Sequence, residues 1–415
     1  MKKLEHSILI KIFYMIPVVD VLLGVATIYL GLYSGNEQNA KMVTLIPGML
    51  IRLMAFLLMF KMSFTKDRVL LLFLVFSFLL LFFTEVRGAL INQEQYSSFA
   101  LGMIYIYKIY FILVSYVFFV RIDPVFGKDI AGKIIPFSFF IYSLAIILGT
   151  LSGQYFTTYG GSGSSGWLIK GSANSISIIF APALAILLPK LYKSNYGMSK
   201  CLFVIFLALQ ASLLMLTKVS TFSILIISLS FFLLYAKLFH RVIIILLLLL
   251  SSVMMVGYLM DTDLFNRLEF VYEYYDGNIF YLLLSGRHEH VIAAFNVLDS
   301  MSVFDIIFGN GYAYFREYMS VYLTKVMGVE IDIFDLFFMN GILFTVVYFS
   351  IIIYVCFRAV MNLFSSVNDS MKMLSISYLL LVLVSFLAGH VLMSGLNGHL
   401  LPIMASTICF KRVKI

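Results

Sequence analysis

The sequence predicts an all-α, polytopic integral membrane protein with about 12 transmembrane helices. Of the 415 residues, 62% are hydrophobic and 12% are charged, and the mean hydropathy is +1.02. Soluble domains are about half apolar and about a quarter charged, so this chain has too few polar residues to cover a water-soluble globule. Long charge-free runs separated by short charged clusters are typical of a chain that crosses a bilayer repeatedly.

The candidate spans follow one another along the whole chain, and each is near the roughly 20 residues that a helix needs to cross hydrocarbon. The clearest are 69–84, 171–189, 219–236, 242–260 and 336–357, and weaker ones are 8–30, 42–60, 103–120, 134–152 and 201–217. The charge-free tail 373–410 is long enough for two more, with a break at Gly395–Gly398. The first stretch carries Asp20 and lacks a small-residue cleavage signal, which favours a retained helix over a signal peptide.

Lysine and arginine are unevenly divided between alternate connections. If the N-terminus is cytoplasmic, the inside segments hold 19 Lys and Arg and the outside segments hold eight, while Arg52 and Lys108 lie within spans. Cytoplasmic loops carry the positive excess, so both termini are expected in the cytoplasm. The net charge of +8 is then a difference between two faces, and no nucleic-acid partner is expected. Cys201, Cys356 and Cys409 are expected near cytoplasmic helix ends as packing residues, without disulfides.

The expected organisation has three parts. Residues 1–260 form transmembrane helices 1 to 9, residues 261–335 form one large periplasmic loop, and residues 336–415 form helices 10 to 12. The loop holds twelve acidic and four basic residues. Apolar residues at helical spacing after Ser285, the expected N-cap, predict a short amphipathic helix over 285–298, which can lie on the membrane surface. A site built by so small a loop must be shared with the helical bundle.

A second outer connection, 153–174, contains six glycines and the only tryptophan, Trp167. Gly/Ser-rich stretches are flexible, and loops longer than about 15 residues tend to be functional or disordered. Two interpretations are open. Trp167 is either an interfacial anchor beside a slack linker, or part of a mobile flap that presents aromatic faces to a sugar ring.

The densest ionisable cluster is Arg287-His288-Glu289-His290. On a helix, Arg287 and His290 share one face. A guanidinium suits bidentate phosphate binding, and a histidine can move protons near neutral pH. The alternative is a solvated helix start. No third ligand is spaced to complete a zinc site with His288 and His290, so neither metal nor cofactor is expected.

Cations on the outer side stand against the positive-inside bias and need a reason. Lys218 lies between two apolar helices, and Arg87 follows a span. Arg52 and Lys108 lie inside spans, where a charge is costly and indicates function unless it pairs with Asp20 or snorkels to the interface. Together these cations predict a site for a multiply charged anion, such as a lipid-linked pyrophosphate.

Acidic residues and histidines near the end of the large loop and in the tail are further candidates. Asp332 follows Glu330 in a short acidic pattern, and Asp335 stands among apolar residues where a helix begins. Asp335 can cap that helix, accept a sugar hydroxyl or act as a base. His390 and His399 lie in the apolar tail, where core hydrogen bonding and a lumen-facing site are both open.

Three motifs resemble those of bacterial O-antigen and capsule repeat-unit polymerases (Wzy), which form one superfamily with the O-antigen ligases. Ser285, Gly286 and Arg287 match an S-G-R before the amphipathic loop helix, Gly309 and Gly311 match the following Gly-x-Gly, and Glu330, Asp332, Asp335 and Gly341 match the acidic entry to the next helix. The segments 16–24 and 388–392 also resemble the family. Ligases carry His-Asn where this chain has Glu330 and Ile331, which favours a polymerase.

The resemblance implies a metal-independent glycosyl transfer at the periplasmic face of the bacterial inner membrane. The donor would be a glycan on undecaprenyl pyrophosphate and the acceptor a lipid-linked repeat unit, with a chain-length regulator as an open partner. The expected catalytic residues are Arg287, His288, His290, Glu330, Asp332 and Asp335. The expected substrate-binding residues are Arg52, Arg87, Lys218, Arg316, Trp167 and His390.

Two other functions are weighed against the polymerase. A lipid-linked oligosaccharide flippase or another twelve-helix carrier would show internal repeats, broken helices and polar residues at mid-membrane. The sequence shows no convincing repeat, and its polar residues concentrate outside. An O-antigen ligase is the third possibility.

Overall fold

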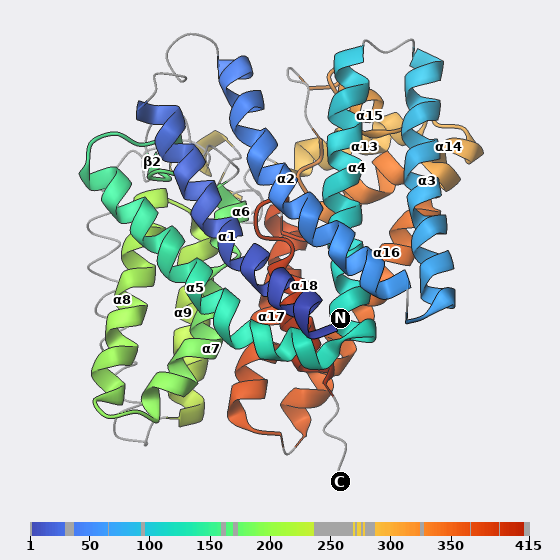
Figure 1. Ribbon diagram of the computed structural model, residues 1–415. Helices are drawn as coiled ribbons and strands as arrows, with labels where there is room; N and C mark the ends of the chain where they lie inside the picture. The colour runs from blue at the N-terminus through green and yellow to red at the C-terminus, as the bar shows by residue number, and fades with distance from the viewer. Residues whose placement is uncertain are drawn as a thin grey trace.

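The computed structural model describes residues 2–29, 37–64, 66–92, 96–158, 163–168, 173–235, 287–323, 328–365, 367–389 and 391–410, with 269, 272–274 and 277–278. Long helices fill most of these segments (Figure 1). The first half comprises α1 (Lys2–Tyr29), α2 (Glu37–Phe64), α3 (Arg68–Asn92), α4 (Tyr96–Tyr116), the π-helix η1 (Val117–Ile122), α5 (Pro124–Leu151), β1 (Thr157–Thr158), β2 (Gly163–Ser164), α6 (Ala173–Ser177), α7 (Phe180–Tyr192), α8 (Gly197–Met215) and α9 (Lys218–Tyr235). The second half comprises α13 (Arg287–Leu298), α14 (Val303–Phe308), α15 (Tyr312–Met319), α16 (Asp332–Phe364), α17 (Asp369–Ala388) and α18 (Leu400–Cys409).

Within the described residues, ten helices are long and apolar enough to cross a membrane, so the chain is a multi-pass membrane protein. These ten correspond to ten of the expected spans. The span expected at 242–260 lies outside the described residues, and α18 is a shorter apolar helix of ten residues. On α3, Leu72 and Phe76 are exposed while Leu74 and Leu81 are buried. An exposed apolar face of this kind suits contact with hydrocarbon.

Figure 1 shows α13, α14 and α15 together at the upper end of the bundle, and the end of α16 and the start of α17 at the lower end. The amphipathic helix expected over 285–298 corresponds to α13, and its expected N-cap, Ser285, lies outside the described residues. The cytoplasmic position of the termini stays a prediction from the charge distribution.

Asp123 shows how local sequence sets the start of α5. It precedes Pro124, and its side chain accepts a hydrogen bond from the Phe126 amide, which caps α5. The same carboxylate contacts His6 at 3.1 Å and Lys66 at 2.8 Å. Burial alone would raise the pKa of Asp123, but the hydrogen bond from Lys66 and the nearby charges outweigh burial and lower this pKa. One residue thus joins α1, the α2–α3 turn and α5.

The described parts of the Gly/Ser-rich connection 153–174 fold into a small hairpin. Strands β1 and β2 pair antiparallel, and the Trp167 amide donates to Ala145 of α5 at 3.2 Å. Gly166 has φ +60°, and a Cβ there would overlap the Ala145 carbonyl. Trp167 is half-buried against the main core. The described part is therefore a packed element, in contrast to the slack linker or mobile flap expected from composition.

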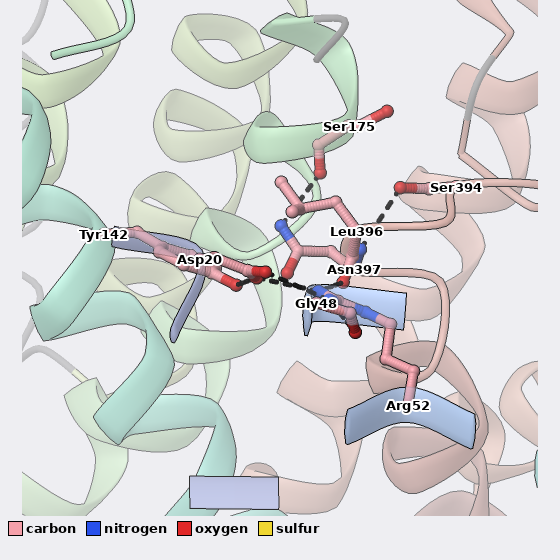
Figure 2. A network of polar contacts seen from close by, with 8 residues as sticks. All are labelled: Asp20, Gly48, Arg52, Tyr142, Ser175, Ser394, Leu396 and Asn397. Carbon is pink, nitrogen blue, oxygen red and sulfur yellow. Dashed lines mark hydrogen bonds and ion pairs between the residues drawn. The ribbon is translucent and has the colours of Figure 1, made fainter. Parts of the chain in front are cut away.

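A buried network of charges crosses the centre of the bundle (Figure 2). The Arg52 guanidinium of α2 donates to both carboxylate oxygens of Asp20 of α1, at 3.0 and 2.7 Å. Tyr142 of α5 donates to the same carboxylate at 2.7 Å. Arg52 also donates to the carbonyl of Gly48 at 3.1 Å and to that of Leu396 at 3.1 Å. Asp20 thus pairs with Arg52 rather than with Lys108.

This network fixes the non-helical segment 391–399 between α17 and α18, where the sequence predicted a break. The Asn397 side-chain amide donates to the Ser175 carbonyl at 2.9 Å (Figure 2). The backbone N–H of Asn397 donates to the Ser394 hydroxyl at 3.2 Å. Irregular backbone at membrane depth must find such partners inside the protein, because lipid offers none. Helices distant in sequence therefore converge on one short segment.

We expect Asp20→Ala to lower the free energy of unfolding by about 3 kcal/mol or more, because it leaves the buried Arg52 charge without its carboxylate. The matched variant Tyr142→Phe removes one hydrogen bond to the same carboxylate and should cost about 1 kcal/mol. Unfolding in detergent micelles measures both. Equal losses for the two variants would show that the ion pair does not hold this region together.

Candidate functional site

The candidate site centres on residues 328–335, here called the acidic turn, which lead into α16. Arg287 and His290, three residues apart on α13, both contact this turn. This confirms that the two residues share one helix face. Asp332 and Asp335 lie in the first turn of α16. The helix α13 and the start of α16 therefore meet at the acidic turn.

Glu330 has a strained backbone that several partners hold in place. Its φ is +61°, a left-handed conformation that costs a residue with a side chain about 1–2 kcal/mol. The Arg287 Nε donates to the Glu330 carbonyl at 3.1 Å, and its Nη2 contacts the Glu330 carboxylate at 3.3 Å. A Cβ at Gly389 would overlap the same carbonyl. Because strain of this kind collects at functional sites, Glu330 and Arg287 are the leading candidates.

His290 has one nitrogen positioned by the acidic turn. Its Nδ1 lies 3.4 Å from the Val329 carbonyl oxygen. A carbonyl can only accept, so this contact requires the proton on Nδ1 and leaves Nε2 as the acceptor of a neutral ring. A histidine in this state can take up a proton at Nε2.

Asp332 and Asp335 hold backbone in place. Asp335 is buried, and it accepts from the amides of Val329 at 2.8 Å and Glu330 at 3.1 Å. Asp332 is also buried, and one of its oxygens accepts from the amides of Val391 at 3.0 Å and Leu392 at 2.7 Å. These bonds fix the acidic turn and the segment 391–399 relative to α16. Among the three expected acids, Glu330 is the one whose side chain is partly exposed, at 32%.

Arg87 of α3 contacts α14 and the glycine that follows it. It forms an ion pair with Asp305 of α14, donates to the Gly309 carbonyl at 2.9 Å, and lies over the Phe304 ring at 4.7 Å. Asp305 also completes a capping box with Ser302 at the start of α14. Arg87, expected to bind substrate, therefore docks α14 on α3 in this structure.

Glycines with conformations open only to glycine bring α14 and α16 into contact. Gly309 (φ +83°) and Gly341 (φ +74°) face each other, and a Cβ on either would overlap the backbone of the other segment. Gly341 lies inside α16, where it makes a kink. The Gly311 amide donates to the Met339 carbonyl at 2.9 Å. The motif glycines thus serve close backbone packing next to the acidic turn.

Two tyrosines that the sequence reading missed join α4 to α15. Tyr105 and Tyr312 stack with ring centroids 4.4 Å apart, and the Asn340 amide donates to the Tyr105 hydroxyl at 3.4 Å. Arg316 donates to the Tyr312 hydroxyl at 2.6 Å and lies over its ring. The Tyr312 amide donates to Glu85 at 2.8 Å. With 26 tyrosines in the chain, nothing in the sequence distinguishes these two.

The remaining expected site residues lie elsewhere or outside the described residues. Lys218 is exposed at the start of α9, and Trp167 packs on α5. Arg52 belongs to the central network, and His288 is a half-buried neighbour of Arg287 on α13. His390 lies outside the described residues. Within the part that the structure describes, no group of three or more His, Cys, Asp or Glu could hold a metal ion.

Gly341→Ala should lower the free energy of unfolding by at least about 2 kcal/mol, because alanine cannot adopt this backbone conformation and its methyl group would overlap the α14 backbone. Gly132→Ala is the matched control. Gly132 lies on the exposed face of α5 with nothing within 4 Å of an added Cβ, and alanine there should be neutral or stabilise by up to about 1 kcal/mol. Thermal unfolding in micelles compares the two, and equal stability would contradict the close contact.

The Arg87–Asp305 pair should give the docking of α14 a pH dependence. Burial alone would raise the pKa of Asp305, but hydrogen bonds from Ser302 and Arg87 outweigh burial and lower this pKa. The stabilisation is therefore complete above the ordinary aspartate pKa of about 3.9, and is lost as the pH falls through the lowered folded-state value.

We expect the difference in unfolding free energy between the native protein and Asp305→Asn to be constant from about pH 5 to 7, and to shrink below about pH 4. Unfolding measured across this range in detergent tests it. A difference that grows on acidification would contradict the assigned pair.

Comparisons with protein-family models, curated proteins and solved structures give no match to this chain. The basis for a function is therefore the chemistry of the residues gathered at the acidic turn.

Proposed function

We propose that the protein is a polysaccharide polymerase of the bacterial inner membrane, which joins lipid-linked oligosaccharide repeat units at the periplasmic face. The observation that carries the proposal is the Arg287–Glu330 pair on the strained acidic turn, with His290 on the same face of α13. The resemblance of the surrounding motifs to the Wzy polymerases supports the same reaction class.

The reaction would be a glycosyl transfer from undecaprenyl pyrophosphate. The bond between the anomeric carbon of the donor glycan and the diphosphate oxygen breaks, and its electron pair leaves with the lipid diphosphate. A hydroxyl oxygen of the acceptor repeat unit forms the new bond to the anomeric carbon. The proton of that hydroxyl passes to a base of the protein. No metal is needed if cations of the protein stabilise the departing diphosphate.

Arg287 and Glu330 would divide these tasks. Without substrate, the Glu330 carboxylate neutralises the guanidinium at 3.3 Å. A diphosphate carries more negative charge and can replace the carboxylate as the partner of Arg287. Glu330, released from the ion pair, would then accept the proton of the acceptor hydroxyl. His290, fixed through Nδ1, is the neighbouring group that can receive the proton in turn.

Arg287→Ala should abolish the long polysaccharide ladder of the producing strain, because the charge that binds the diphosphate is lost. Arg121→Ala, at an exposed position at the end of η1, is the matched control and should leave the ladder unchanged. Membrane levels of both variants are measured by immunoblot. A normal ladder from well-expressed Arg287→Ala protein would refute this role.

Glu330→Gln should reduce polymerisation by about 100-fold or more, since the amide keeps the shape of the side chain but cannot accept the proton. Its stability should change little, because the Glu330 side chain is partly exposed. Asp335→Asn serves as the contrast, since Asp335 is buried and its change should act through stability. Polymer formation from purified lipid-linked repeat units, normalised to folded protein, separates the two. An active Glu330→Gln enzyme would rule out the carboxylate as base.

The central network gives one observation in favour of a carrier, such as a lipid-linked oligosaccharide flippase. Asp20 and Arg52 are buried beside the non-helical segment 391–399, and transporters place charged residues at broken helices near mid-membrane. Deletion strains separate the two functions. Loss of a polymerase leaves single repeats that still reach the cell surface, whereas loss of a flippase retains them on the cytoplasmic leaflet.

A further inference from the structure

The helix α15 and the turn after it carry a row of three tyrosines that the proposed chemistry does not use. Tyr314, Tyr318 and Tyr322 follow one another at every fourth position. The Tyr322 amide donates to the Met319 carbonyl at 3.1 Å, so the chain keeps turning after α15 ends. Residues four apart share one side of a helix. The ring centroids of Tyr314 and Tyr318 are 5.6 Å apart, and those of Tyr318 and Tyr322 are 6.5 Å apart.

The three rings, here called the tyrosine row, are open to a partner on their outer side. Tyr322 is 45% exposed, and Tyr314 and Tyr318 are half-buried. Successive rings meet at interplanar angles of 33° and 62°, so they are tilted or edge-on rather than stacked face to face. Their faces are therefore not covered by one another. A tyrosine combines such an apolar ring with a polar hydroxyl at its tip.

The inner side of α15 fixes the row next to the proposed reaction site. Phe315 and Met319 are fully buried in an apolar cluster that also contains Ile331 of the acidic turn, and Tyr318 packs against the same cluster. The Phe315 ring lies parallel to the Phe338 ring of α16, with centroids 5.2 Å apart. The tyrosine row and the acidic turn therefore rest on one cluster.

The charge beside the row indicates contact with water rather than hydrocarbon. Glu317, next to Tyr318, is exposed, and a carboxylate is costly in contact with lipid chains. Val321 is exposed too, but one apolar side chain at a water surface is ordinary. On α14, by contrast, the exposed neighbours Val303 and Phe304 are both apolar. Lipid contact therefore suits α14, and a polar partner suits α15.

A partner for this row needs several apolar faces in succession, together with hydroxyl groups. Sugar rings have both, because their C–H faces pack on aromatic rings and their hydroxyls can bond to tyrosine hydroxyls. A chain of sugars can engage successive rings, whereas one small molecule would engage a single ring. Tyrosine supplies this contact at a low cost in conformational entropy, since it has two side-chain torsions.

We propose that Tyr314, Tyr318 and Tyr322 bind the oligosaccharide part of the lipid-linked substrate. This inference rests on the proposed function for the identity of the ligand. The sugars held by the tyrosine row are those away from the bond that Arg287 and Glu330 would act on. Binding energy from such remote sugars keeps the reacting end in place and holds the growing chain between additions.

The test measures binding of the repeat-unit oligosaccharide, released by mild acid from the lipid-linked precursor of the producing strain, to the purified full-length protein by calorimetry. The detergent carries no sugar headgroup, because such a headgroup would compete for the rings. Tyr322→Ala should weaken binding about fivefold or more, since one ring contact is lost, and Tyr322→Phe should retain most of the affinity. Tyr354→Ala, at a 48% exposed position on α16, is the matched control and should bind as the native protein does.

Tyr318→Leu is the second variant, because leucine keeps an apolar contact with the cluster but has no flat ring. It should weaken binding as Tyr322→Ala does, and thermal unfolding checks that both proteins are folded. Native affinity in these two variants would overturn the proposal and leave the row as an aromatic belt at the membrane surface. Absence of binding to the native protein would overturn it as well.

The proposed function is judged separately by the Arg287→Ala ladder. Oligosaccharide binding that depends on Tyr322, together with a normal ladder, would refute the role of Arg287 in polymerisation and keep the tyrosine row. A lost ladder together with binding that ignores the tyrosines would keep the polymerase and refute the row.

Discussion

The ion pair between Asp20 and Arg52 is the interaction on which the centre of this molecule depends. A charge buried in a bundle of apolar helices is tolerated only with a close partner, and here two helices each supply one. Tyr142 of α5 donates a hydrogen bond to Asp20, and Arg52 donates one to the Leu396 carbonyl of the segment 391–399. Four parts of the chain are thereby held at one point, and the irregular segment obtains the partners that lipid cannot provide.

Backbone contacts between glycines hold α14 against α16, at the end of the bundle where α13 and α15 also lie. Gly309 and Gly341 let α14 approach the kink of α16, and Arg87 ties the same loop to α3. Asp332 and Asp335 link the acidic turn to its surroundings through backbone amides. These contacts therefore hold the backbone around the strained Glu330 and its partner Arg287 in place. A site needs such supporting contacts if a side chain is to keep its geometry while its charge partner changes.

The long spans were predictable because hydrophobicity and length decide whether a helix can cross a bilayer, and neither depends on tertiary contacts. Short motifs indicated Arg287, His290 and Glu330 as candidates, and the structure places the three residues together at the acidic turn. The role of Arg87 in docking α14 was not predictable, since the identity of its partner depends on which loop residue reaches α3. The packed hairpin around Trp167 was missed because glycine-rich composition is shared by flexible linkers and by tightly packed turns.

The sequence by itself determined that the protein lives in a bilayer, which stretches are apolar enough to span it, and which few charges need an explanation. Only the tertiary structure decided how those charges are matched. Asp20 could have balanced either Arg52 or Lys108, because both lie inside spans and charge alone does not choose between them. Helix packing brings Arg52 to Asp20, and no ion pair of Lys108 is found among the described residues. The physical reason is that electrostatic pairing acts over a few ångströms, a scale that only the folded arrangement of helices sets.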